Sequence, residues 1–137
     1  MAIQDRGEKA RNLIGELKQI LEIDNHEVWI EGKIWYGLRA NNIYKYAYGM
    51  EAYESDEKTW CMFVAEIGVP RSTVDYKMAL YKMWVLDLGY KPKELSDINP
   101  RKLHRAIPKV NKENAELILE QARHLTIYDF LEWLKEI

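Results

Sequence analysis

The side chains best suited to a chemical role are those of three consecutive residues, Arg71, Ser72 and Thr73. They stand at the expected start of a helix, where free backbone N–H groups and hydroxyls suit the oxygens of a phosphate. A guanidinium at the same place can donate two hydrogen bonds to the edge of a guanine. These residue types in this order therefore predict a contact with DNA, in which Arg71 is the principal base contact.

Two short helices joined by a tight turn are expected to position these residues. In the first helix, Phe63, Val64 and Ile67 form an apolar stripe at helical spacing. Gly68 suits a turn with positive φ, and Pro70 suits the first turn of the following helix. That helix continues the stripe with Val74, Met78, Tyr81 and Val85. The pattern is that of a helix-turn-helix, whose second helix usually enters the major groove of DNA.

One position departs from this pattern, because Lys77 stands where an apolar residue is usual. We expect Met78 to supply the missing packing, and Lys77 and Lys82 to flank the outer face and contact phosphates. Asp75 is a difficulty on that face, since a carboxylate repels phosphate unless it accepts a hydrogen bond from a cytosine amino group. Tyr76 is placed to reach a base edge or a sugar.

A second basic cluster, Arg101, Lys102 and Arg105, lies on a short helix expected after Asn99-Pro100. It is expected either to hold the DNA backbone or to be an ordinary solvated surface. The candidate DNA-binding residues are Arg71, Ser72, Thr73, Asp75, Tyr76, Lys77, Lys82, Arg101, Lys102 and Arg105.

A longer pattern around the turn resembles a known group of proteins. Six residues match a helix of the form L-xxx-I-R-xxx-L-Y-R, namely Ile34, Leu38, Arg39, Ile43, Tyr44 and Lys45. Trp60 and Phe63 match an aromatic pair, residues 68–76 resemble the turn G-I-S-R-S-x-A-Y, and residues 95–103 resemble a helical segment often found downstream. Over about residues 34–103 the chain is thus similar to small helix-turn-helix proteins of phages, plasmids and integrated mobile elements.

The resemblance implies a DNA-binding protein of a mobile genetic element. Two features depart from the group's pattern: Pro70 replaces a serine, and the connector after Gly49 is longer and more acidic. These departures concern local contacts rather than the architecture.

Helical spacing over nearly the whole chain predicts an all-α fold built around the central helix-turn-helix. Residues 1–23 are expected to form an amphipathic helix, 24–90 the helix-turn-helix domain, and 91–137 a C-terminal extension of short helices packed on it. The N-terminal helix suits either dimerisation or the covering of a core. Its apolar stripe includes Leu13, Leu17, Ile20 and Leu21.

One helical segment has an alternative interpretation, and several other helices have clear start or end signals in the sequence. Residues 28–36 could form a hairpin turning at Glu31-Gly32, but we favour one helix from Glu27 to Tyr48. The second helix of the turn is expected to end at Gly89. Further helix starts are expected after Pro92, Asn99, Asn111 and Thr126.

Charge is unevenly distributed along the 137 residues, whose net charge is −2. Residues 69–112 carry ten Lys or Arg against four Asp or Glu, a local +6, whereas the segments before and after are each −4. A basic middle is a plausible footprint for nucleic acid. Cys61, the single cysteine, is expected to be a small buried residue, and no metal cluster, cofactor motif or catalytic set emerges.

Two functions compete on these observations. The first is a non-enzymatic, cytoplasmic DNA-binding protein, a regulator or DNA-marking protein that acts as a homodimer on double-stranded DNA. The second is an oligomeric protein-interaction or packaging adaptor, in which the helix-turn-helix is only architecture. No membrane or small-molecule partner is expected in either. The two differ in whether Arg71 and Lys82 lie on one exposed basic face or are held in ion pairs within the chain.

Overall fold

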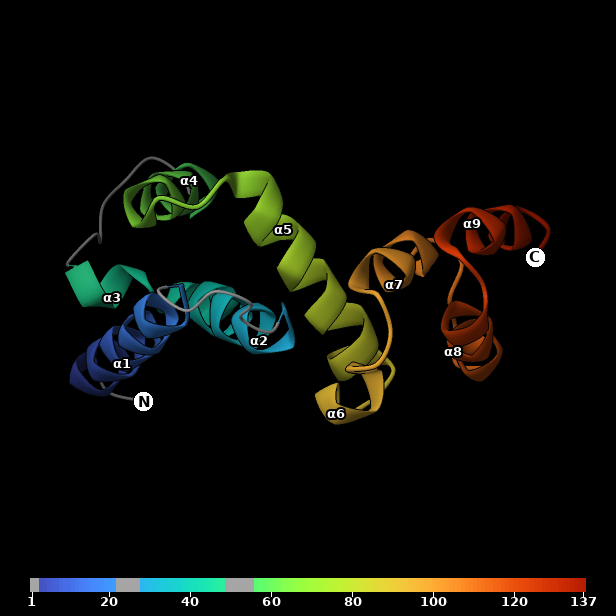
Figure 1. Cartoon of the computed structure of the whole chain (residues 1–137). Helices are drawn as coiled ribbons and strands as arrows, with labels where there is room; N and C mark the ends of the chain where they lie inside the picture. Colours follow the sequence, from blue (N-terminus) through green and yellow to red (C-terminus); the bar gives the residue numbers. More distant parts are fainter. Residues whose placement is uncertain (1–2, 22–27, 49–55) are drawn as a thin grey trace. The chain divides into compact units, whose positions relative to one another are not determined.

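The computed structural model describes residues 3–21, 28–48 and 56–137, and every regular element in these ranges is helical (Figure 1). The expected all-α fold is therefore confirmed. The connector around Gly49 and the boundary expected near residue 23 lie outside the described residues. The elements are α1 (Ile3–Leu21), α2 (Val28–Arg39), η1 (Ala40–Asn42), α3 (Lys45–Tyr48), α4 (Asp56–Ile67), α5 (Arg71–Leu80), η2 (Tyr81–Asp87), α6 (Pro92–Leu95), α7 (Pro100–Ala106), α8 (Ala115–His124) and α9 (Ile127–Lys135).

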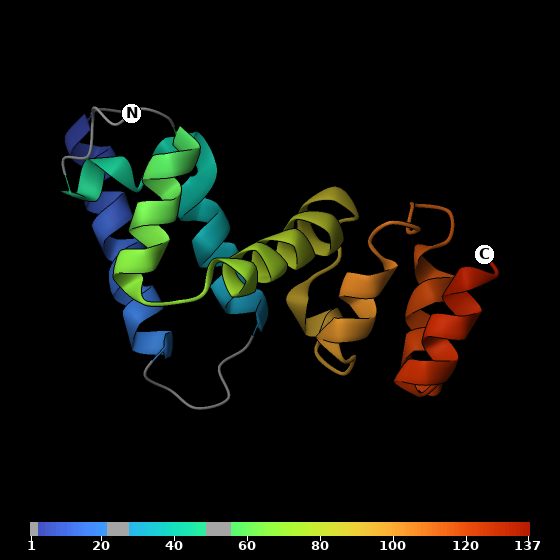
Figure 2. The same ribbon diagram turned by 90° about the horizontal axis from the view of Figure 1, so that it is seen from above.

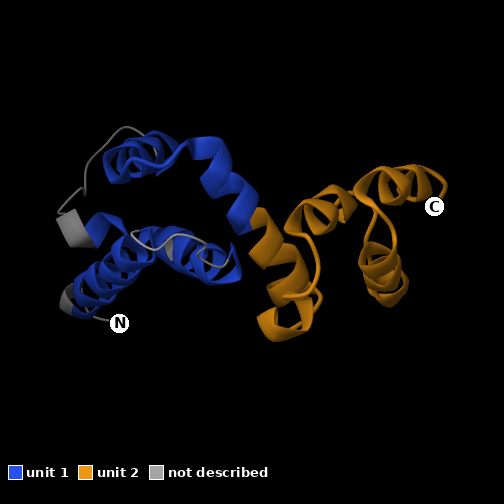
Figure 3. Cartoon of the chain, viewed as in Figure 1, with its two compact units in different colours: residues 1–78 blue, residues 79–137 orange. Residues whose placement is uncertain are grey.

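The chain forms two compact units, residues 1–78 and 79–137 (Figure 3). In unit 1, α1 packs against α2 and α3, and α1, α2, α4 and the start of α5 together enclose an apolar core. Edge-on aromatic contacts organise this core, with the Trp35 and Trp60 ring centroids 6.0 Å apart at 88°. The residues in its centre include Leu17, Trp35, Leu38, Tyr44, Trp60, Phe63 and Val74.

The N-terminal helix belongs to this core. Ala10, Ile14 and Leu17 of α1 are buried in it, and Leu13 and Ile20 pack against its edge. Of the two alternatives for its apolar stripe, the structure shows the covering of the chain's own core. This face is therefore not left open for a second copy.

The segment 28–36 is helical, as favoured over a hairpin, but the expected single helix to Tyr48 is wrong. The helix narrows to a 3-10 turn in η1, and Asn42 takes φ of 55°, a left-handed conformation that asparagine tolerates better than most residues. The break turns Tyr44 inward, where its ring centroid lies 4.9 Å from that of Trp60 and 5.1 Å from that of Phe63. A straight helix would have lost this burial.

Unit 2 begins near the end of α5 and includes η2, whose wider π-helical turns carry the segment to Asp87. Gly89 then adopts φ of 82°, which confirms the expected helix end. Trp84 is fully buried and its indole N–H donates to the carbonyl of Leu103 on α7 at 3.0 Å. Figure 2 shows α8 and α9 side by side within the unit.

Local start signals in unit 2 are confirmed with two corrections. The side chains of Asn99 and Thr126 cap α7 and α9, as expected. Helix α6 covers Pro92–Leu95, so it begins at the proline itself rather than after it. Helix α8 begins at Ala115 rather than directly after Asn111. Asn111 still caps the turn before the helix, because its side chain accepts from the Asn114 N–H at 2.8 Å and the Asn114 side chain accepts from the Asn111 N–H at 2.7 Å.

Candidate functional site

The turn between α4 and α5 has the local geometry that its residues predict. Gly68 takes φ of 92° and its N–H donates to the carbonyls of Val64 and Ala65. Val74 then points into the core of unit 1 and is fully buried. Ser72 and Asp75 are exposed on the other side of α5, which is the outward face expected for a helix that reads DNA.

Arg71 stands at the start of α5 but is engaged on several sides within the chain. Its guanidinium donates to Glu57 at 2.6 Å and to Asp75 at 2.9 Å, and Nη1 lies 2.6 Å from the sulfur of Cys61. Although partial burial disfavours the charged form, the hydrogen bonds to Asp75 and Glu57 raise the pKa of Arg71 above its ordinary value. The expected principal base contact is thus already neutralised by two carboxylates.

Glu57 links α4 to two other elements of unit 1. It accepts from Arg71 on one side and from Arg39 at 2.9 Å on the other, and the hydrogen bond from Arg71 lowers the pKa of Glu57. The Arg39 guanidinium also lies over the Trp60 ring, 5.1 Å from its centroid. The prediction of a buried Cys61 is wrong, because the thiol lies on the exposed side of α4 beside these charges.

Lys77 does not flank a phosphate-binding face. Its ammonium lies 2.5 Å from Oε2 of Glu31 on α2, and the Glu31 side chain is fully buried while that of Lys77 is 14% exposed. The lysine therefore occupies the inward position that a helix-turn-helix normally gives to an apolar residue, and a carboxylate inside unit 1 compensates its charge. Met78 packs against the core beside it, as expected.

The lysines of unit 2 among the candidates are also engaged within the chain. Lys82 forms an ion pair with Asp87 at 3.0 Å on the surface of η2. Lys102 donates to the carbonyls of Ala122 and Leu125 at 2.8 and 2.5 Å, so it caps the C-terminal end of α8, where a cation is favourable. Its expected role at a DNA backbone is replaced by this structural one.

Arg101 and Arg105 of α7 are both exposed, and within the described ranges no hydrogen bond or ion pair engages either guanidinium. They are one helical turn apart and share a face.

Thr73 and Tyr76 of α5 are partly buried. The structure therefore brings Arg71, Ser72 and Asp75 together at one exposed helix start, and commits Lys77, Lys82 and Lys102 to partners elsewhere.

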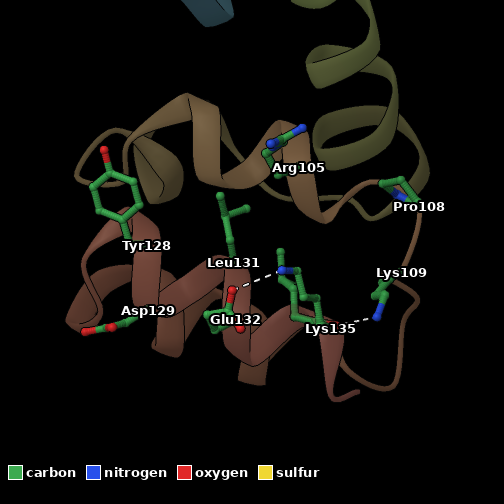
Figure 4. Close-up of a pocket in the computed structure, with 9 residues that line it drawn as sticks. Arg105, Pro108, Lys109, Tyr128, Asp129, Leu131, Glu132 and Lys135 are labelled. Atoms are coloured by element: carbon green, nitrogen blue, oxygen red, sulfur yellow. Dashed lines mark hydrogen bonds and ion pairs between the residues drawn. The ribbon is translucent and has the colours of Figure 1, made fainter.

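Sequence reasoning missed a groove between α7 and α9 in unit 2, shown in Figure 4. It holds about 490 Å³, within the range of ordinary ligand pockets. Tyr128 on its edge is 80% exposed, an unusual position for a large ring. The apolar face of the last helix was the available signal, but it did not show which of its residues stay open. The groove is lined by Arg105, Pro108, Lys109, Tyr128, Asp129, Leu131, Glu132, Leu134 and Lys135.

No family model, curated protein or solved structure matches this chain. The resemblance to helix-turn-helix proteins of mobile elements therefore stays a prediction from the residues quoted for it. Among the described residues, no helix combines the length and apolar character that crossing a membrane requires. In the same part of the chain, no three His, Cys, Asp or Glu side chains gather in a way that would hold a metal ion.

Proposed function

We propose that this chain is a non-enzymatic protein-interaction module in which the α4–α5 pair serves as architecture. The observation that carries the proposal is the compensation of the best candidate DNA cations by carboxylates of the same chain. Arg71 lies between Glu57 and Asp75, Lys77 lies on Glu31, and Lys82 lies on Asp87. This is the arrangement expected if the helix pair is a scaffold.

The charge around the turn supports the same conclusion. Residues 56–78 contain three Lys or Arg and four Asp or Glu, a net charge of −1, and one of these cations is Lys77. Glu57 and Asp75 expose more than half of their side chains beside Arg71. Duplex DNA carries about one negative charge per 1.7 Å. DNA that approaches this surface is therefore repelled by the exposed carboxylates before it reaches an available cation.

Two selections run in parallel test the proposal. The protein is presented with a displayed library of random peptides and with a pool of random double-stranded DNA. We expect peptides with a shared pattern to be enriched, and the Arg71→Ala variant to bind them as the unaltered protein does. Enrichment of a DNA sequence, with no peptide pattern, would overturn the proposal.

A second candidate function, DNA reading by α5, is favoured by one observation. Val74 is buried while Ser72 and Asp75 are exposed, so the polar face of α5 is open to solvent. Exposed ion pairs such as those of Arg71 typically contribute less than about 1 kcal/mol, so a guanine could replace them. In this case the chain would be a regulator or DNA-marking protein of a mobile element, and a dimer would have to use a surface other than the stripe of α1.

Titrations with the best DNA fragment and a scrambled one test this candidate. If α5 reads DNA, Arg71→Ala weakens binding by about 1–3 kcal/mol and relaxes preference at one base pair. Lys82→Ala instead weakens both fragments equally and lowers the salt slope by about one. If Arg71→Ala binds each of the two fragments as tightly as the unaltered protein does, this candidate function is ruled out.

A further inference from the structure

We infer that the groove between α7 and α9 docks a short acidic amphipathic helix of a partner protein. The inference rests on the proposed function and names the partner's chemistry. It follows from three properties of the groove in unit 2: exposed apolar side chains, one available guanidinium, and a length that suits about two helical turns.

The apolar part of the groove lies along α9. Leu131 points toward α7, and Tyr128 stands at one end while Pro108 stands at the other (Figure 4). Tyr128 exposes 80% of its surface and Leu131 is partly exposed, whereas Leu134, which also lines the groove, is buried. A partner side chain that covers the ring and Leu131 would remove apolar surface from water, which favours binding.

The charges around the groove leave one cation available. Three cations and two carboxylates line it, a net charge of +1. Lys135 is paired with Glu132 at 3.0 Å, and the ammonium of Lys109 donates to the carbonyls of Leu134 and Ile137.

Arg105 differs from these residues, because its guanidinium lies on the α7 side of the groove and Figure 4 shows Asp129 pointing away from it. Within the described residues, no carboxylate takes up its donors. A planar guanidinium binds a carboxylate through two parallel hydrogen bonds. The complementary partner therefore carries a carboxylate next to its apolar anchor.

The length of the groove suits a helical partner. Tyr128, Leu131 and Lys135 stand at i, i+3 and i+7 on α9, a stripe about 10 Å long at the helical rise of 1.5 Å per residue. Two turns of a partner helix cover this length, and an apolar stripe laid into a groove between two helices is a recurring mode of recognition.

Fluorescence anisotropy with two synthetic peptides tests the inference on the full-length protein. Both peptides are about 16 residues long, with leucine at helical spacing, and their polar positions are filled with glutamate in one and lysine in the other. We expect the glutamate peptide to bind and the lysine peptide not to bind. Tyr128→Ala and Arg105→Glu should each lower the affinity for the glutamate peptide about tenfold, as expected of interface anchors.

Arg101→Glu is the matched control, since Arg101 is exposed on the same helix but does not line the groove. It should change affinity by less than about twofold, as expected for a charge outside the contact. Equal weakening by both arginine variants would mean general attraction to the basic surface, and would overturn the inference. Binding of the lysine peptide, or of neither peptide, would do the same.

The failure of this inference is distinguishable from that of the proposed function. If the peptide selection enriches a pattern that Arg105→Glu and Tyr128→Ala still bind at full strength, the interaction module stands and its docking surface lies elsewhere. If the selection enriches only DNA, the proposed function itself fails.

Discussion

Replacement of Lys77 by methionine is the most informative single change, because it separates a structural lysine from a DNA-binding one. The ammonium and the buried Glu31 carboxylate are 2.5 Å apart. At an effective dielectric constant of about 20, this separation corresponds to an attraction of about 7 kcal/mol. The desolvation of the two groups opposes that attraction by several kcal/mol.

The cost of breaking the pair can be bounded. Removal of one partner from a buried pair typically destabilises a protein by about 3–5 kcal/mol. We therefore expect Lys77→Met to lower the free energy of unfolding by about 3–5 kcal/mol.

Urea unfolding followed by tryptophan fluorescence measures this change, with Trp35 and Trp60 reporting from the core of unit 1. Lys82→Met is the matched control, because Lys82 also pairs with a carboxylate but exposes 57% of its side chain. It should cost under about 0.5 kcal/mol.

The double variant Glu31→Leu with Lys77→Met should recover most of the loss, since apolar residues often replace a buried pair without penalty. If Lys77→Met costs no more than Lys82→Met, the argument that Lys77 is a structural residue is refuted.

Two further changes test the turn and the pH dependence. Gly68→Ala should destabilise the protein by about 1–2 kcal/mol, through the backbone alone, because φ is 92° and an added Cβ meets no atom within 4 Å. Gly15→Ala, in equally open space on α1, should instead stabilise it slightly; equal effects in urea titrations would contradict the reasoning. Burial, and then the nearby Arg105, lower the pKa of His104 below its ordinary value of 6.5. The unfolded chain therefore binds more protons than the folded one near and below pH 6.5, so the free energy of unfolding should fall as the pH falls through 6.5. His104→Asn should remove that slope, and an unchanged slope would show that other groups cause it.

The sequence alone predicts those features that depend on neighbours within a few residues. The apolar stripes predict helices, Gly68 and Gly89 mark turns that need positive φ, and the side chains of Asn99 and Thr126 cap the helices that follow them. Each signal acts over one or two helical turns, through backbone sterics or a local hydrogen bond. For this reason, the outward face of α5 could be predicted together with the helix itself.

The tertiary structure alone decides which charges remain available. Lys77 and Glu31 are 46 positions apart. Lys102 donates to the carbonyls of Ala122 and Leu125, which are 20 and 23 positions away. No local pattern distinguishes such a lysine from one that waits for a phosphate, because the difference lies in what packs against it. The same reason hides the groove: the stripe of α9 predicts an apolar face, but only its packing against α7 leaves Tyr128 and Arg105 open.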